Sequence, residues 1–165
     1  QQPKNYQYLA TDDIVLSIPR LGVRTTITGI PILPNGTWDV SWLWKQAGWL
    51  QGSAFPTLNG NSVITGHVYL PNGKTGPFVN LGKLKYGDKI IVYAFGQKYT
   101  YEVRQNIKVL PANLTVLKHE EKAWITLLTC QGYNEDTNTY ANRVAVRAIL
   151  IKTEQGSALP NRSTR

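Results

Sequence analysis

The chain contains a single cysteine, Cys130, at the end of the run Thr-Leu-Leu-Thr-Cys, and Arg143 follows thirteen residues later. A lone thiol cannot form a disulfide within the chain, so it is a small side chain packed in the core, a modification target or a nucleophile. The apolar residues before Cys130 predict a strand, and a glycine-containing loop follows them. A thiol at such a strand end is held by the sheet and open on one side, which suits a reactive group.

A thiol nucleophile needs a partner that takes its proton, because the thiolate is the attacking species. A free thiol, with a pKa of about 8.5, is only slightly ionised at neutral pH. The chain offers two histidines, His67 and His119. His67 ends a predicted strand and follows Gly66, which leaves room for close approach, whereas His119 lies among charged residues and is expected at the surface. We therefore predict that His67 is the acid–base partner.

Acyl transfer also needs positive charge where the tetrahedral oxyanion develops. Arg143 begins the strand after the Cys130 loop, and its side chain can end near the thiol if the two strands are neighbours. Taken singly, each residue has an ordinary interpretation: a buried cysteine is a small hydrophobe, a strand histidine is structural and a strand arginine lies at the surface. The spacing of the three residues leaves both interpretations open.

Short strands must position these side chains, and little helix is expected around them. Apolar alternation and turn residues predict strands at 14–18, 23–28, 62–68, 89–95, 98–109, 123–130 and 143–151. Short helical segments are expected near 41–47, within 78–84 and within 110–121. The absence of a βαβ rhythm favours a mostly antiparallel barrel or sandwich.

Length and composition fit one folded domain. The chain has 165 residues, of which 42% are hydrophobic and 17% charged. Residues 1–11 are expected to form a flexible arm and residues 153–165 a flexible tail. No run of 18 apolar residues is present, so no membrane span is expected.

The formal charge is +8 and the pI is about 9.6. The basic residues are scattered, which is typical of a solvated surface but also fits attraction to an anionic cell-wall polymer or nucleic acid.

Two other functions remain open from the residues. Four tryptophans between Trp38 and Trp49 could form a glycan-binding platform, with the thiol incidental, although such a cluster is more typical of core or a packed loop. A cysteine endopeptidase that only hydrolyses is the third hypothesis. No zinc-ligand spacing or phosphate-binding loop is found, and we expect neither a metal nor a cofactor.

Taken together, the motifs resemble the sortase family of bacterial cysteine transpeptidases. The run ending at Cys130, its paired Arg143 and the upstream Thr-Gly-His-Val containing His67 carry the resemblance. The Ser-Ile-Pro-Arg-Leu-Gly-Val run, the tryptophan-rich segment and Leu-Lys-Tyr-Gly-Asp-Lys-Ile follow sortase patterns in the same order. The resemblance covers about residues 13–152, and we expect a catalytic domain over residues 12–152.

This resemblance implies a closed eight-stranded sortase-type β-barrel, mostly β, with one or two short helices. It implies Cys130 as nucleophile, His67 as acid–base residue and Arg143 as the residue that binds the substrate backbone and the oxyanion, with Thr129 helping to position the substrate. The implied reaction cleaves a Leu-Pro-x-Thr-Gly-like sorting signal between Thr and Gly through a thioester. An amine then takes the acyl group.

The implied partners are secreted proteins bearing a C-terminal sorting signal and an amine acceptor from a peptidoglycan precursor or a pilin, with no nucleic acid. The implied location is the extracellular face of a Gram-positive cell membrane, reached through an anchor not present in this chain. The segment 110–122 is too short for the helical insertion of class B, and no Asp-Pro-aromatic lid anchor of class C is found. We therefore expect an enzyme resembling classes A, D or E.

Overall fold

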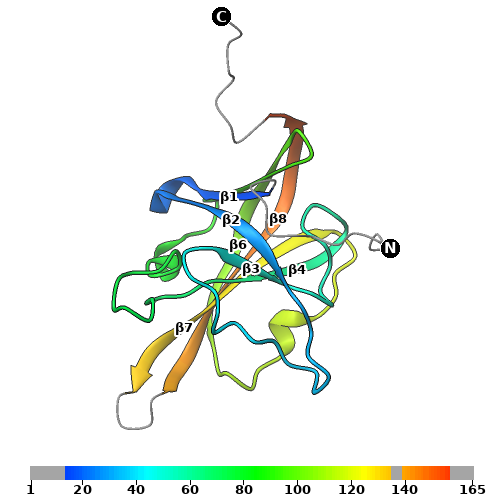
Figure 1. The fold of residues 1–165 in the computed structure, drawn as a ribbon. Helices are drawn as coiled ribbons and strands as arrows, with labels where there is room; N and C mark the ends of the chain where they lie inside the picture. Colours follow the sequence, from blue (N-terminus) through cyan, green and yellow to red (C-terminus); the bar gives the residue numbers. More distant parts are fainter. Residues whose placement is uncertain (1–13, 135–138, 157–165) are drawn as a thin grey trace, which may run out of the picture.

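The computed structural model describes residues 14–134 and 139–156; within 130–134 and 139–141 it describes the backbone only. Eight strands and three short 3-10 helices make up the fold (Figure 1). In chain order they are β1 (Val15–Ile18), η1 (Pro19–Leu21), β2 (Val23–Ile30), β3 (Ala47–Leu50), β4 (Gly60–Thr65), η2 (Leu81–Lys83), β5 (Lys89–Ala94), β6 (Gln97–Val109), η3 (Thr115–Leu117), β7 (Ala123–Asn134) and β8 (Thr139–Gln155).

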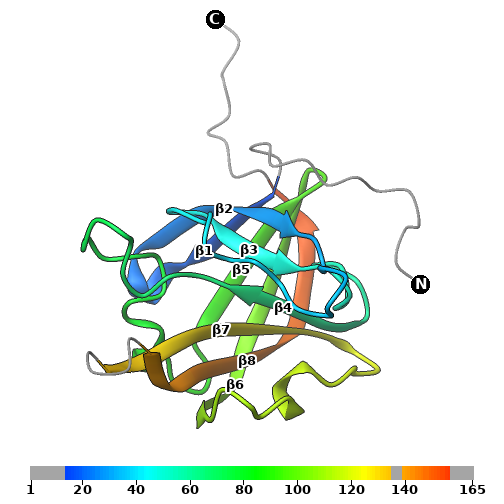
Figure 2. The same ribbon diagram turned by 60° about the horizontal axis from the view of Figure 1, so that its bottom comes forward.

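The strands close into a barrel in the order β1-β2-β3-β4-β7-β8-β6-β5, with β5 pairing back to β1. Figure 2 shows β2, β3, β4, β7 and β8 following one another down one side. The pairs β2–β3 and β4–β7 are parallel and the others antiparallel, so the barrel is mixed rather than wholly antiparallel. A parallel β4–β7 pair brings the carboxyl ends of two strands that are distant in sequence to the same edge.

Alternating side chains form two apolar clusters on opposite faces of the strands. Ile64 of β4 and Leu127 of β7 belong to the interior cluster, together with Val146 of β8. Their neighbours Val63 and Leu128 belong to a second cluster, which therefore lies on the outer face. Segments 31–46 and 110–122 cover this outer cluster, so three central strands are buried on both sides.

The helical expectations were partly wrong. Residues 41–46 form turns and bends instead of a helix, and they lead into β3, which the sequence did not predict. All four residues of β3 are buried, so the strand lacks the alternation that would have identified it. The expected turn within 78–84 contains η2, and the segment after Pro111 contains η3.

The last two strands are longer than predicted. Both β7 and β8 run past the expected ends, and Figure 1 shows them projecting from the barrel as a two-stranded ribbon. β8 also takes in residues 153–155, which were expected to belong to the tail. The expected arm at 1–11 and the remainder of the tail from 157 lie outside the described residues.

Candidate active site

The parallel register of β4 and β7 brings the His67 segment beside Cys130. Thr65 is the Cα partner of Leu128, so His67 and Cys130 each lie two residues beyond the last paired position. The contact continues past the ladder, because the Thr129 hydroxyl donates to the Gly66 carbonyl oxygen at 2.9 Å. The backbones that carry the histidine and the cysteine therefore leave the barrel side by side.

The antiparallel register of β7 and β8 makes Cys130 and Arg143 direct Cα partners. Directly opposed residues in such a pair have Cα atoms about 4.5–5.5 Å apart. The three residues predicted from the sequence thus lie on three neighbouring segments. Cys130 and Arg143 lie within β7 and β8 and not at a strand end as predicted, because the pairing of these strands continues to Asn134 and Thr139, whereas His67 lies two residues beyond the end of β4.

Two polar atoms flanking position 130 are buried without a hydrogen-bond partner among the described residues, Nε2 of His67 and Nε of Arg143. Buried polar atoms are nearly always paired, and an unpaired one costs about 1–3 kcal/mol. Both atoms are thus available to a ligand or to a neighbouring group at this strand end. Unpaired donors at a site of acyl transfer could hold a substrate carbonyl or a developing oxyanion.

The backbone of His67 is fixed by the loop that follows it. The Phe78 amide donates to the His67 carbonyl oxygen at 3.1 Å, and the Gly76 amide donates to the Val68 carbonyl oxygen at 2.7 Å. Two glycines, one before His67 and one in the loop after it, are crowded: a Cβ on Gly66 would lie 2.9 Å from the Phe78 ring, and one on Gly76 would lie 2.1 Å from the His67 oxygen. Glycine is required at both positions for the loop to fold back this tightly.

Thr129 and His119 lie in contrasting environments. Thr129 is 4% exposed, and its hydroxyl donates a hydrogen bond to the Gly66 carbonyl oxygen. Thr129 therefore holds the backbone just before His67 in place. His119 is exposed, and its ring lies against Gly60, at the opposite end of β4 from His67. The structure therefore separates the two histidines by the length of a strand.

An apolar pocket of about 200 Å³ lies on the outer face of β3 and β4. Its walls include Ile32, Trp38 and Leu117, and Leu50 and Val63 lie beneath them. Val63 is on β4, four residues before His67, so the pocket lies on the strand that leads to the candidate site. Its lining can take an apolar side chain of a bound peptide.

Asn61, a residue to which the sequence reasoning gave no role, anchors one wall of this pocket. It is 2% exposed, and its amide nitrogen donates to the carbonyl oxygens of Val116 at 2.7 Å and Lys118 at 3.0 Å. Its amide oxygen accepts from the Thr126 hydroxyl at 2.6 Å. The side chain thus joins β4, β7 and the η3 turn that carries Leu117. A polar residue at the start of an apolar strand was the only sequence signal for this role.

An ion pair also holds the same segment, since Arg147 Nη2 lies 2.6 Å from Glu120 Oε1. The Arg147 guanidinium also stacks 4.8 Å from the centre of the Trp124 ring. Within residues 14–134 and 139–156, no cluster of three or more metal-ligating His, Cys, Asp or Glu side chains is found.

The tryptophans do not form one platform. Trp49 is 7% exposed and packs edge-on against Phe55, and Trp38 donates from Nε1 to the Gln51 carbonyl oxygen at 2.9 Å. Only Trp42 and Trp44 are exposed, at 51% and 41%. The cluster is therefore divided between core and surface loop.

The solved structures that this chain resembles include sortases of several classes. Sortase A from Corynebacterium diphtheriae, in a lid mutant, superposes with a TM-score of 0.71 at 31% identity, over 91% of this chain and 74% of that one. The pilus-related sortase C of Group B Streptococcus superposes with a TM-score of 0.70 at 28% identity, over 87% of this chain and 69% of that one. A Clostridium perfringens sortase D5 transpeptidase superposes with a TM-score of 0.66 at 25% identity, over 85% of this chain and 79% of that one.

The sortase domain matches residues 16–151, and the chain belongs to the sortase family, a family of cysteine transpeptidases. Among curated proteins, sortase A of Bacillus anthracis is 27% identical over 128 residues, which are 74% of this chain and 56% of that protein. The chain therefore spans little more than half the length of that relative. No helix among the described residues has the length and apolar character needed to cross a bilayer.

Proposed function

We propose that this chain is the catalytic domain of a sortase that cleaves a Leu-Pro-x-Thr-Gly-like sorting signal between Thr and Gly and transfers the acyl group to an amine. The observation that carries the proposal is the strand register, with Cys130 opposite Arg143 on one side and the His67 segment hydrogen-bonded through Thr129 on the other. Membership of the sortase family supports it. An incidental thiol, as in a glycan-binding module, would not explain this register.

In the proposed reaction, the Cys130 thiolate attacks the carbonyl carbon of the signal threonine. The carbon–nitrogen bond to glycine breaks as His67, in its protonated form, gives a proton to the leaving amine, and a thioester remains. An acceptor amine then attacks the thioester, a new amide bond forms, and the sulfur leaves as thiolate while His67 takes up the proton. Arg143 balances the negative charge on the carbonyl oxygen in both steps.

The outer-face pocket supports recognition of the signal. Its apolar lining of Ile32, Trp38 and Leu117 suits the signal's leucine, and its position along β4 puts a peptide bound there in line with His67. Burying one leucine side chain contributes about 1.5–3 kcal/mol, enough to hold the signal in register. Thr129 would act on the substrate indirectly, by holding the Gly66–His67 backbone.

The proposed setting is the outer face of a bacterial cell membrane. The substrates would be secreted proteins carrying the sorting signal, and the acceptor would be an amine of a peptidoglycan precursor or a pilin. The proposed subtype is an enzyme resembling classes A, D or E, on the sequence features given above.

The test is mass spectrometry of the protein mixed with a sorting-signal peptide, with and without an amine. We expect a covalent adduct that lacks the glycine-containing fragment, and a ligated product only when the amine is present. Cys130→Ala should abolish the adduct, and His67→Ala should slow its formation by about 10²–10⁴-fold. His119→Ala, the matched histidine at the far end of β4, should leave the rate unchanged.

Full adduct formation by the Cys130→Ala variant would refute the proposal. Hydrolysis without any ligated product would instead indicate a cysteine endopeptidase.

A further inference from the structure

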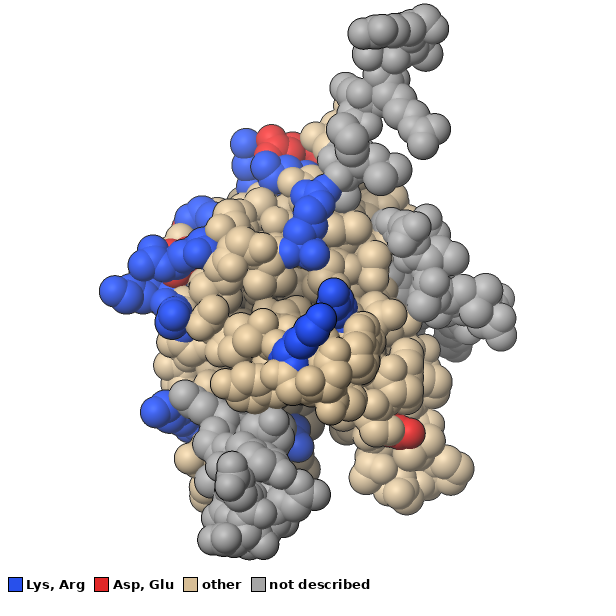
Figure 3. Space-filling view, turned by 60° about the vertical axis from the view of Figure 1, so that its left-hand side comes forward, with Lys and Arg blue, Asp and Glu red and all other residues tan. Residues whose placement is uncertain are grey.

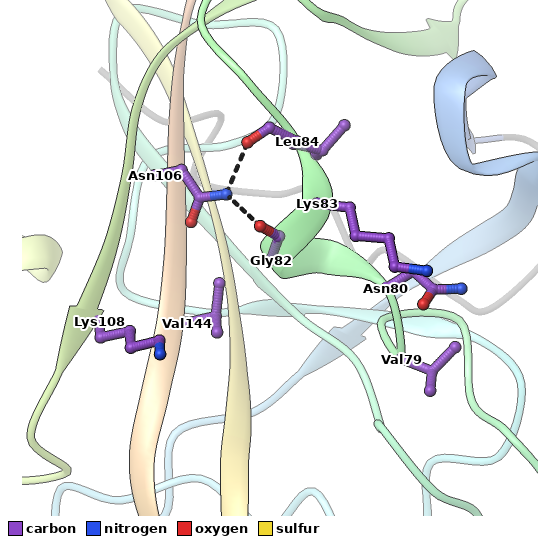
Figure 4. A pocket seen from close by; sticks show the side chains of 8 residues that line it. All are labelled: Val79, Asn80, Gly82, Lys83, Leu84, Asn106, Lys108 and Val144. Atoms are coloured by element: carbon purple, nitrogen blue, oxygen red, sulfur yellow. Dashed lines mark hydrogen bonds between the residues drawn. The ribbon is translucent and has the colours of Figure 1, made fainter.

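A second and larger pocket lies on the reverse side of the strand that carries Arg143. Its volume is about 580 Å³, and it is bounded by η2 on one side and by β6 and β8 on the other (Figure 4). Lys108 of β6 is the Cα partner of Val144, the residue after Arg143, and both line the pocket. The pocket is therefore separated from the candidate active site by the thickness of β8.

The opposite wall is tied to the His67 segment. Val79 and Asn80 line the pocket directly after Phe78, whose amide donates to the His67 carbonyl oxygen. Asn106 braces the wall from β6, since its amide nitrogen donates to the carbonyl oxygens of Gly82 at 3.0 Å and Leu84 at 2.7 Å (Figure 4). The pocket is thus built from the same elements that position the proposed catalytic residues.

The charge of the pocket is positive. Lys83 and Lys108 line it, and among the described residues neither has a carboxylate within ion-pair distance. Figure 3 views the molecule from the side on which η2 lies in Figure 1, and the charged side chains there are mostly Lys and Arg. A negatively charged group would be attracted to this face and could pair with either lysine.

We propose that this pocket binds the carboxylate-bearing portion of the peptide amine that accepts the acyl group, an inference that rests on the proposed function. In Figure 4 the two lysines stand on different walls, with the Asn80 amide beside Lys83 and Val144 beside Lys108. Donors spread in this way suit an extended peptide with apolar and charged parts better than a compact ion, which needs convergent donors. Such a peptide would approach the thioester from the side away from the sorting signal.

Measuring the two half-reactions separately distinguishes this pocket from the signal site. Acylation is followed as adduct formation with the sorting peptide. Transfer is followed as the KM for the acceptor triglycine, compared with the KM for triglycinamide, which lacks the carboxylate. Wild-type protein should show the lower KM for triglycine. The double variant Lys83→Gln/Lys108→Gln should raise the KM for triglycine about tenfold, as loss of about 1.4 kcal/mol of charge-assisted binding implies. It should leave the KM for triglycinamide and the acylation rate unchanged.

A matched control removes the same charge elsewhere. Lys118 and Lys122 are both exposed and lie near the opposite end of β4, so Lys118→Gln/Lys122→Gln should leave all three quantities unchanged. A steric variant is independent of charge: a Cβ on Gly82 would lie 3.9 Å from Val144 Cγ2, an ordinary contact, so Gly82→Leu should fold and fill the pocket. It should weaken use of both acceptors and spare acylation.

Equal KM values for triglycine and triglycinamide in the wild type, or an unchanged triglycine KM in the pocket double variant, would overturn the inference while leaving the proposed function intact. Failure of the wild-type protein to form any adduct would overturn the proposed function and this inference with it.

Discussion

At the scale of single residues, the buried polar side chains divide into those that are satisfied and those that are not. Asn61 has hydrogen bonds at both its amide nitrogen and its amide oxygen, to groups on the η3 segment and on β7. His67 Nε2 and Arg143 Nε have none among the described residues. Asn61 holds a wall of the apolar pocket, whereas these two atoms, which are among four unpaired buried atoms in the described residues, belong to the residues beside the proposed nucleophile. Asn61 is thus suited to position the site, and the unpaired atoms of His67 and Arg143 are open to a substrate.

Replacing Asn61 with leucine should therefore destabilise the fold and weaken signal binding. The change leaves the Val116 and Lys118 carbonyl oxygens and the Thr126 hydroxyl without their partner, at a cost of about 1–3 kcal/mol in the free energy of unfolding. Because Leu117 follows Val116, the KM for the sorting peptide should also rise. Urea unfolding and peptide kinetics measure the two effects.

The control is Asn72→Leu, which removes a bond to the Lys74 amide in an exposed loop and should change stability by less than about 0.5 kcal/mol. Equal stability of the two variants would show that the Asn61 network does not hold the segment.

At the scale of elements, the loop after β4 depends on close packing of backbone against an aromatic ring. Gly66 lies against Phe78, which is 1% exposed, and the Phe78 amide holds the His67 carbonyl. The ring cannot move away without disturbing the interior cluster to which it belongs. The orientation of His67 is thus coupled to the packing of the barrel end.

Gly66→Ala should accordingly cost about 1–3 kcal/mol in unfolding free energy through overpacking, and it should slow acylation because the His67 backbone is displaced. Gly82→Ala is the matched change, since its new methyl group meets only ordinary contact distances and stability should be equal or slightly higher. Thermal unfolding and adduct formation by both variants test this. Wild-type acylation by Gly66→Ala would mean that the loop tolerates the shift.

At the scale of the whole molecule, the closed barrel buries a polar group in its interior. Tyr101 is fully buried, and its hydroxyl accepts from the Thr57 amide at 3.2 Å. Burial raises the pKa of Tyr101 far above its ordinary value, because the phenolate would lack water. In the unfolded chain the same phenol ionises near pH 10. Above that pH the folded state retains a proton that the unfolded state loses, so stability falls as the pH rises.

The expected contribution of this one proton is a slope of up to about 1.4 kcal/mol per pH unit above about pH 10. Tyr101→Phe removes the titrating group, so its unfolding free energy should fall less steeply with pH than that of the wild type. Below pH 9 the variant should be the less stable protein, because the Thr57 amide loses its acceptor. If the unfolding free energies of the two proteins fell equally steeply above pH 10, Tyr101 would not be the group that causes the loss of stability.

The sequence by itself determined the local parts of this protein. Apolar patterns and turn residues predicted seven of the eight strands. The spacing from Cys130 to Arg143 allowed the two side chains to meet only if their strands were neighbours, and the pairing of β7 with β8 makes them so. The motifs around Cys130 and His67 indicated the family. The strand β3 was not predicted because it has only four residues, all of them buried, which is too short a run to show a period of two.

The tertiary structure decided what depends on distant segments. His67 precedes Cys130 by 63 residues, and only the parallel pairing of β4 with β7 makes their segments neighbours. Parallel pairing needs a crossover, and no local pattern in either strand records its partner. The Asn61 network and the basic pocket between η2 and β8 likewise arise from residues contributed by separate elements. They exist only once the barrel has closed, since barrel closure fixes which side chains face one another.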